Sequence, residues 1–350
     1  MLKAELPRKL GLLDATVIVI GTVIGSGIFL VPGAVARSLP SAGLILAVWA
    51  LTGVLTFCGA LAYAELGAMM PDTGGQYVYL REAYGPLVGF VSGWASFMVI
   101  QSGGIATLAA GFSIYLSYFV KLGPIGEKVT SVLLIAVLTA VNYRGVRLGA
   151  GVQRVFTFLK LAGLAIVVVS AFLGPRHAAE TANAAPATFS ASSFGVAMIA
   201  CLWAYEGWNC LGFVAGEVKR PERNILLALV LGTVALIAIY LAANVAYLRV
   251  LTVPAIQAAD RVAATTAEAT MGPIGGTLVS LTILFSIIGA TNGSILTYAR
   301  IYFAQAHDGL FFRAVGNIHR RFETPHIAIA VQGVWVCVLA LAGSYEILFS

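Results

Sequence analysis

The stretch GTVIGSGIFLVPGAV, residues 21–35, decides how the rest of the chain is interpreted. It lies in the uncharged run 15–36, which has about the 20 residues that a helix needs to cross a bilayer. Its centre, Gly25-Ser26-Gly27, is where a continuous helix is weakest, because glycine is a poor helix former. Hydrocarbon offers no water to the broken backbone. We therefore predict an interrupted helix whose freed backbone groups need another partner.

The composition is that of a membrane protein. Hydrophobic residues make up 59% and charged residues 10% of the 350-residue chain, whereas soluble domains contain roughly 25% charged residues. We predict an all-α integral membrane protein with about nine spans, near residues 14–37, 43–69, 86–120, 127–143, 151–173, 193–214, 224–248, 271–303 and 326–343. The longest polar connections are expected at 174–192, 249–270 and 304–325.

The basic residues predict the orientation of the bundle. With a cytoplasmic N-terminus, the inner side receives 14 lysines and arginines and the outer side 6, with Lys160 set aside inside a span. The positive-inside rule favours this arrangement. We expect a multi-pass protein of the cell (plasma or inner) membrane, in contact with the lipid bilayer. The net charge of +6 follows from the topology and indicates no nucleic-acid partner.

The reactive side chains indicate neither an enzyme nor a metal protein. The four cysteines, Cys58, Cys201, Cys210 and Cys337, all fall within predicted spans and show no metal-binding spacing. The histidines are scattered, and we find neither an HExxH pair nor a convincing nucleophile–base constellation. We expect no catalytic residue, no metal and no cofactor.

The spans form a weak inverted repeat. Span one is interrupted at residues 25–27 and span six at AYEGW, 204–208, while spans three and eight are both unusually long. The matching features lie five spans apart, an odd number, so the second half crosses the membrane upside down. Paired interruptions of this kind indicate the binding site of a transporter. We predict one transporter domain over 1–350, with a first repeat over 1–173 and an incomplete second repeat over 193–350.

The two interruptions suit a zwitterion. Unwinding at Gly25-Ser26-Gly27 would free their N–H groups and that of Ile28, and create a helix N-terminus that favours a carboxylate. Glycine also lets a ligand approach closely and adopts unusual backbone angles. The outer half of span six ends near Trp203-Ala204, where unpaired carbonyls suit an ammonium group. The alternative is that residues 25–27 are a small-residue packing face between helices.

Four long segments resemble one known family. GTVIGSGIF resembles the first-helix motif of the amino acid–polyamine–organocation (APC) superfamily, and AYEGWNCLGFVAGEVKRPERNI resembles the sixth helix and following loop of its L-type amino acid transporter branch. AELGAMMPDTGGQYVYLREAYGP and NGSILTYARIYFAQAHDGLFF are similar to further segments, in the expected order. The resemblance implies a LeuT-type bundle with a 5+5 inverted repeat that moves L-amino acids by alternating access.

Two departures from the family qualify this expectation. The chain stops at Ser350, soon after span nine, where the family continues with a tenth core helix and usually two more, so we expect a truncated sequence. The outer loop KLGPIGEK has no cysteine, whereas animal members use a cysteine there to bind a glycoprotein subunit. No disulfide-linked heavy subunit is expected.

The resemblance also assigns substrate contacts around both breaks. It implies that the residue 25–27 backbone holds the carboxylate, and that the carbonyls of Val23, Trp203 and Glu206 lie near the amine. Trp203 would be the aromatic gate, the alternative being an ordinary buried or interfacial tryptophan. Asn209 would hydrogen-bond near the substrate, or pack between helices as a polar residue. Gly104 would admit the substrate side chain, or allow close helix packing.

The sequence allows two alternative roles for each of three acidic residues. An acid inside a span is costly and suggests a functional site, and Glu206 is such an acid. It either recognises a cationic substrate side chain or is neutralised by a helix end or by protonation. Glu65 and Glu217 lie near cytoplasmic ends, where they either form gating ion pairs with Arg81, Lys219 or Arg223 or are solvated end charges.

Lys160 is the basic residue deep in a predicted span. It either snorkels toward the inner boundary marked by Arg154, or places its ammonium between the Gly21 carbonyl and Ser286. Family members carry a lysine in helix five where sodium-coupled relatives bind sodium, so the resemblance implies transport without sodium.

The leading functional interpretation is therefore a sodium-independent secondary amino acid transporter, an exchanger. A proton-coupled amino acid importer on the same fold is the second interpretation. A non-transporting membrane amino acid sensor is the alternative from another class.

Overall fold

The expected interruption of the first span is present. The computed structural model describes residues 6–174, 190–259 and 261–343. In it α1 (Leu12–Val23) and α2 (Gly27–Ser38) are separated by a short break and bent by 43° relative to each other. The break falls at the glycine-rich centre of the apolar run, where helix propensity is lowest.

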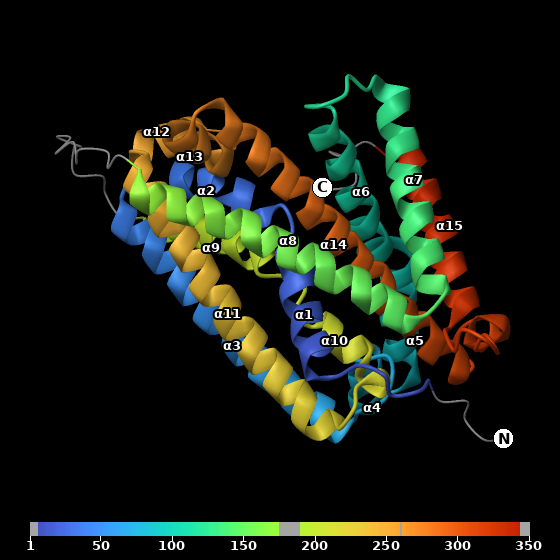
Figure 1. Ribbon diagram of the computed structural model, residues 1–350. Helices are drawn as coiled ribbons and strands as arrows, with labels where there is room; N and C mark the ends of the chain where they lie inside the picture. The colour runs from blue at the N-terminus through green and yellow to red at the C-terminus, as the bar shows by residue number, and fades with distance from the viewer. Residues whose placement is uncertain (1–5, 175–189, 260, 344–350) are drawn as a thin grey trace.

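Helices make up almost all of the described chain (Figure 1). After α1 and α2 the elements are α3 (Ala42–Met69), α4 (Gln76–Tyr84), α5 (Pro86–Ala95), the π-helix η1 (Ser96–Ile100), α6 (Gln101–Leu116), α7 (Pro124–Tyr143), α8 (Val146–Leu173), α9 (Ala191–Ala204), α10 (Cys210–Phe213), the 3-10 helix η2 (Ala215–Glu217), α11 (Pro221–Val250), α12 (Val253–Ala258), α13 (Val262–Met271), α14 (Pro273–His307), the 3-10 helix η3 (Arg313–Gly316) and α15 (His326–Ala342).

The structure has fewer helices of full membrane-spanning length than the nine spans that the sequence pattern predicts. Six helical segments of the described chain are long and apolar enough to cross a membrane, and the broken pair α1–α2 makes a seventh. The regions of the sixth and ninth expected spans hold shorter apolar helices, α9 with 14 residues and α15 with 17. A count of nine spans stays a prediction.

The expected connection over 249–270 joins α11 to α14 and contains two short helices, α12 and α13. The Thr252 hydroxyl caps α12 by accepting from the Ala255 N–H, and a proline follows at the start of the helix. In α13, Val262, Ala263 and Ala267 are buried at helical spacing, so packing against the bundle stabilises the helix.

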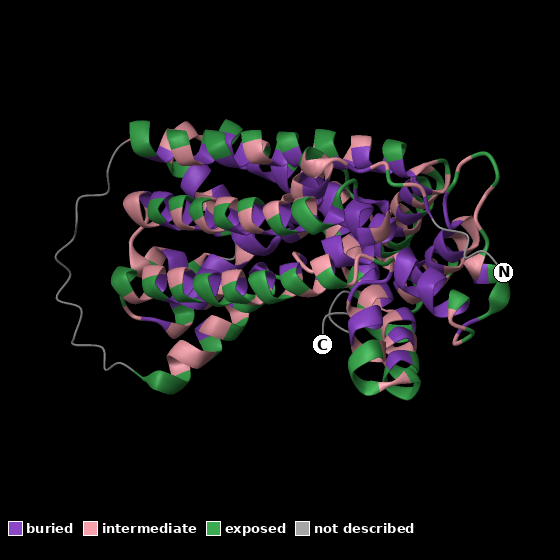
Figure 2. Ribbon diagram, turned by 90° about the horizontal axis from the view of Figure 1, so that it is seen from below, coloured by how far each residue is buried: buried purple, intermediate pink, exposed green. Residues whose placement is uncertain are grey.

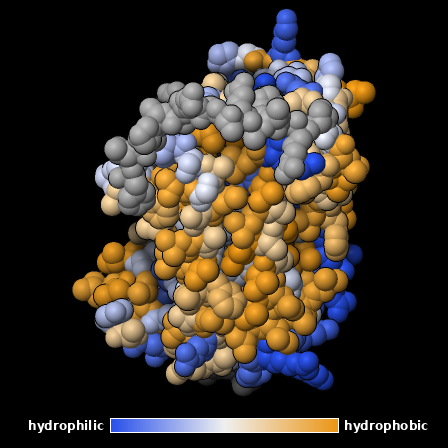
Figure 3. All heavy atoms as spheres, turned by 90° about the vertical axis from the view of Figure 1, so that its left-hand side faces the viewer, coloured by the Kyte–Doolittle hydropathy of each residue, from blue (hydrophilic) through white to orange (hydrophobic). Residues whose placement is uncertain are grey.

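The outer surface matches a lipid environment. Helices at the margin turn exposed residues outward and buried residues inward (Figure 2). On one face, hydrophobic side chains form a broad band across the middle, and hydrophilic side chains gather toward its ends (Figure 3). Exposed leucines, valines and isoleucines on the long helices face hydrocarbon rather than water in this arrangement.

The centre of the bundle is built around α14, the most buried of the six long helices. It runs beside α8, and α3 runs beside α11 (Figure 1). Glycines permit the close approach: a Cβ on Gly163 of α8 would lie 2.1 Å from the Thr282 hydroxyl of α14. Buried amides add hydrogen bonds, because Asn292 of α14 donates to the Gln153 side chain and accepts from Asn142, both at 3.0 Å.

Candidate functional site

A cavity of about 290 Å³ lies where the two interrupted helices meet. Backbone and side chains of the α1–α2 break, of η1 and α6, of the segment after α9 and of α14 surround it. Its lining consists of Thr22, Val23, Gly25, Ser26, Gly27, Ile100, Gly104, Thr107, Leu108, Gly111, Trp203, Ala204, Glu206, Gly207, Ile287, Ser294 and Tyr298. Breaks that are distant in sequence thus form one site.

The N-terminus of α2 faces this cavity with uncapped backbone donors. Ser26 occupies the N-cap position but makes no side-chain cap hydrogen bond. Gly27 and Ile28 belong to the first helical turn, whose N–H groups have no intrahelical acceptor. The expectation for Gly25 is wrong, because its N–H donates to the Val23 carbonyl at 2.8 Å. The remaining donors and the positive end of the helix favour an anion.

The second break presents carbonyl oxygens to the same cavity. Helix α9 ends at Ala204, and Gly207 has φ +118°, a conformation that favours glycine. Two carbonyls expected near a substrate amine already accept one hydrogen bond each from the backbone: Val23 from Gly25 and Trp203 from Glu206. A carbonyl oxygen has two lone pairs and can accept more than one hydrogen bond.

Two hydroxyl groups join the breaks, and the sequence patterns did not reveal them. The buried Tyr240 hydroxyl on α11 donates to the Ala204 carbonyl at 2.9 Å and lies 3.3 Å from the Val23 carbonyl. The Thr22 hydroxyl lies 3.0 Å from the Gly207 carbonyl. A hydroxyl inside an apolar span was the available signal, because buried hydroxyls need partners.

Most of the residues expected at the substrate lie together. Eight of them line the cavity: Val23, Gly25, Ser26, Gly27, Gly104, Trp203, Ala204 and Glu206. Ile28 is buried behind the lining, and Asn209 donates to the Glu206 carboxylate at 3.2 Å instead of lining the cavity. Trp203 is 43% exposed, so it is not an ordinary buried tryptophan.

The glycines of the first break do not adopt the unusual backbone angles that were expected of them. Neither Gly25 nor Gly27 has a positive φ. What Gly27 supplies is close approach, because a Cβ there would lie 3.1 Å from the Ala204 Cα and Cβ atoms. Gly25 is different: the nearest atoms to a Cβ, on Leu108 and Ala290, are 4.0 Å away.

Glu206 is the acidic group of the cavity lining. Its carboxylate accepts from the Asn209 amide at 3.2 Å, and no lysine or arginine is among the described residues of the lining. Ser294 and Tyr298 of α14 face the same space. The cavity therefore combines an uncompensated carboxylate with hydroxyl groups that accept or donate.

Lys160 of α8 lies behind the first break and is fully buried. Its ammonium donates to the Gly21 carbonyl at 2.9 Å, the Ile24 carbonyl at 2.5 Å and the Ser286 carbonyl at 2.9 Å. The snorkelling alternative is wrong, since all three protons point into the bundle. Arg154, which was expected to mark the boundary, pairs instead with Asp14 of α1 at 3.3 Å.

A buried ion pair lies on the side of the bundle that holds the N-terminal segment, which we call the N-terminal face. Glu217 of η2 and Arg300 of α14 are almost fully buried and approach to 2.7 Å, with a second contact at 3.3 Å. Glu217 had been expected to pair with Arg81, Lys219 or Arg223, or to be solvated, and both expectations are wrong. The N-terminal segment is fixed to the same loop, because the Leu10 N–H donates to the Glu217 carbonyl at 2.9 Å.

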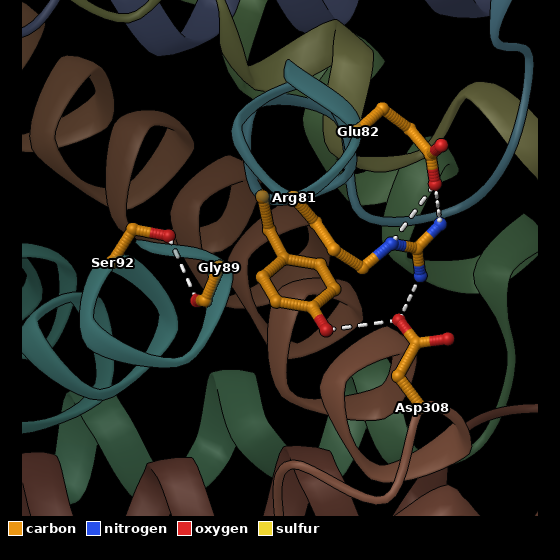
Figure 4. A network of polar contacts seen from close by, with 6 residues as sticks. Arg81, Glu82, Gly89, Ser92 and Asp308 are labelled. Atoms are coloured by element: carbon orange, nitrogen blue, oxygen red, sulfur yellow. Dashed lines mark hydrogen bonds and ion pairs between the residues drawn. The ribbon is translucent and has the colours of Figure 1, made fainter. Parts of the chain in front are cut away.

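A second polar cluster joins α4 to the end of α14 (Figure 4). The Arg81 guanidinium lies between Glu82 and Asp308 and pairs with both carboxylates. The Tyr77 hydroxyl donates to the same Asp308 oxygen at 2.8 Å. Burial, and after it the hydrogen bond to Asp308, raises the pKa of Tyr77, so its phenol stays a donor. Together with the Lys9–Glu323 pair, these contacts cross-link the N-terminal face.

Comparisons with known proteins show which proteins this chain resembles. The model of the amino acid permease family matches residues 10–350. The human b(0,+)-type amino acid transporter 1 is 35% identical over 346 residues, which cover 97% of this chain and 71% of the relative. The serine/threonine exchanger SteT of Bacillus subtilis (strain 168) is 36% identical over 340 residues, 96% of this chain and 77% of the relative. The rat large neutral amino acids transporter small subunit 2 is 33% identical, over 91% of this chain and 62% of the relative.

Proposed function

The chain belongs to the amino acid permease family, and from this we propose that it exchanges L-amino acids across a membrane by alternating access, without sodium. The observation that carries the proposal is the shared cavity of the two broken helices. There an uncapped helix N-terminus and the carbonyl end of another helix face one space. Opposite partial charges at these two ends suit the carboxylate and the ammonium of one amino acid.

In the proposed bound state, the substrate carboxylate accepts from the N–H groups of Ser26, Gly27 and Ile28. The ammonium donates to the carbonyls of Val23, Trp203 and Glu206. Trp203 covers the substrate as the gate, and Gly104 leaves room for its side chain. The small residues also allow close packing of α2 against the end of α9, because a Cβ at Gly27 would lie 3.1 Å from Ala204.

Sodium independence follows from the position of Lys160. Its ammonium occupies the carbonyl oxygens of Gly21, Ile24 and Ser286, which a cation at this position would need. A second positive charge there would meet like-charge repulsion in a low dielectric. We propose that Lys160 replaces the sodium ion as the fixed link between α1 and α14.

The contacts also suggest which state is present. Ion pairs cross-link the N-terminal face, and a further cavity adjoins the central one through Ser26 and Gly111. With the N-terminus in the cytoplasm, as the positive-inside rule favours, the site is closed on the inside and open toward the outside. Breaking Arg300–Glu217 and Arg81–Asp308 would then accompany inward opening.

Glu206 suggests the substrate class. An unpaired carboxylate in a membrane cavity is costly, and a cationic side chain would compensate it. We propose that lysine- or arginine-like substrates gain affinity from Glu206. The competing proposal, neutralisation of Glu206 by protonation, predicts no preference for cationic amino acids.

A proton-coupled importer remains the second candidate, and a non-transporting sensor the third. The inverted-repeat boundaries, 1–173 and 193–350, and the absence of a disulfide-linked heavy subunit are part of the same proposal. Uptake of radiolabelled amino acid into proteoliposomes separates the candidates. An exchanger needs internal amino acid, an importer needs an inward proton gradient, and a sensor binds substrate without uptake.

A further inference from the structure

We propose that the cavity adjoining the central site is an outer carboxylate-capture site, in which Arg261 holds an amino acid before it enters. This inference rests on the proposed transport function, since it assigns a residue to the entry path of the same substrate. Arg261 belongs to the segment that begins α13, far along the chain from both broken helices.

The geometry places this second cavity on the route to the central one. It measures about 320 Å³, within the range of small-molecule sites, roughly 300–1,000 Å³. Ser26 and Gly111 line both cavities, so the two spaces meet at the N-terminus of α2. Arg261 is the N-cap residue of α13, and Figure 1 shows α13 at the opposite end of the bundle from α4 and α10. On the proposed topology this is the outer side.

The chemistry of the lining suits a carboxylate followed by an organic side chain. Arg261 is exposed and is the basic residue among the described residues that line either cavity. Its guanidinium carbon lies 5.4 Å from the centre of the Tyr118 ring, which orients the charge without neutralising it. No ion pair of Arg261 occurs within the described part of the chain. A guanidinium presents its donors as a planar fork that recognises a carboxylate in bidentate fashion.

The ring of Tyr118, which is 49% exposed, and that of Tyr115 flank the space between Arg261 and Ser26. A substrate carboxylate released by Arg261 next meets the uncapped N-terminus of α2, which is also positive. The electrostatic potential is thus positive at both ends of the entry path, at Arg261 and at the N-terminus of α2, and favours the substrate carboxylate at each. A positive charge at the mouth of a low-dielectric cleft raises the association rate of an anionic group, and salt weakens this effect.

The effect of Arg261 on the KM should differ between the outer and the inner face of the membrane. Arg261 acts on substrate arriving from the outer face and is remote from substrate arriving through the ion-paired N-terminal face. Loss of its charge should therefore raise the KM for outer substrate, leave the inner KM unchanged, and leave turnover at saturation nearly unchanged. A merely structural arginine would affect both faces equally.

The test compares Arg261→Gln with Arg261→Lys, which keeps the charge, and with Lys121→Gln. Lys121 is an exposed outer lysine that lines neither cavity, so its replacement removes the same charge without changing the path. Uptake of a radiolabelled amino acid is measured in sealed cells for the outer face and in inside-out vesicles for the inner face, with both compartments loaded with unlabelled amino acid for exchange. Each measurement is made at low and at high choline chloride concentration.

We expect Arg261→Gln to raise the outer KM about tenfold at low salt, which is the effect of losing one charge-assisted hydrogen-bonded contact. The wild-type outer KM should rise with salt, and that of Arg261→Gln should not. Arg261→Lys should recover most of the affinity, and Lys121→Gln should match the wild type. An unchanged outer KM, equal changes on both faces, or the same effect in Lys121→Gln would overturn the capture site. Wild-type protein without saturable uptake at either face would overturn the proposed function itself.

Discussion

Replacing Lys160 by alanine tests how α1 is held against α14. The ammonium contacts three carbonyl oxygens, but they do not depend on it equally. The Ile24 carbonyl keeps a hydrogen bond from the Ser286 hydroxyl at 2.8 Å, and the Ser286 carbonyl lies inside the continuous helix α14. The Gly21 carbonyl has no such substitute, because the Gly25 N–H turns to Val23 instead.

The expected loss of turnover in Lys160→Ala follows from the Gly21 carbonyl. Leaving a buried carbonyl without a partner costs about 1–3 kcal/mol, so we take about 2 kcal/mol for the lost link. If this link holds the transport-competent arrangement, a cost of about 2 kcal/mol lowers turnover roughly 30-fold. Substrate affinity should change less, because no Lys160 atom belongs to the lining of the cavity.

The assay measures turnover and substrate affinity separately in proteoliposomes, with sodium or choline outside. Lys160→Met is the matched variant, because it keeps most of the side-chain volume and removes only the charge. Both variants should show reduced turnover, and the wild type should be equally active in the two salts. Full activity of both variants, or wild-type uptake that is lost in choline, would show that Lys160 does not replace sodium.

Three further predictions concern the cavity and its inner closure. Gly25→Val should fold, because the atoms nearest to the new Cβ are 4.0 Å away, at ordinary contact distance, but it should weaken amino acid binding at least tenfold in a scintillation proximity assay; unchanged affinity would make residues 25–27 a packing face only. Glu206→Gln should reduce arginine and lysine transport far more than that of alanine or leucine, and equal losses would assign Glu206 to structure. Glu217→Gln should leave the Arg300 charge buried without compensation, at a cost of about 3–5 kcal/mol that thermal unfolding would detect; an unchanged midpoint would argue against the buried pair.

Local chemistry was enough to predict the break in the first span. Glycine and serine in an uncharged run of membrane length leave few other structures, and the matching interruption after Ala204 follows the same rule. The position of Lys160 was predictable for a related reason, since a buried ammonium needs several acceptors and a broken helix supplies them.

The ion-pair and hydrogen-bond partners of individual side chains could not be predicted in the same way. Glu217 had several arginines and lysines within reach along the sequence, and only the folded arrangement, which brings η2 next to Arg300 of α14, selects that partner. The Tyr240 bridge depends likewise on where α11 passes both breaks. Helices α12 and α13 were missed because both are short and half of their buried positions are alanines, which give little hydrophobic contrast.

Trans-stimulated uptake of a single radiolabelled amino acid tests the central proposal most directly. Purified protein is reconstituted in liposomes that are either empty or loaded with the same unlabelled amino acid, in choline buffer and without a proton gradient. The proposed exchanger should take up label only into loaded liposomes, and Gly25→Val should abolish this uptake. Equal uptake into empty and loaded liposomes, or uptake that appears only with sodium or an inward proton gradient, would contradict it.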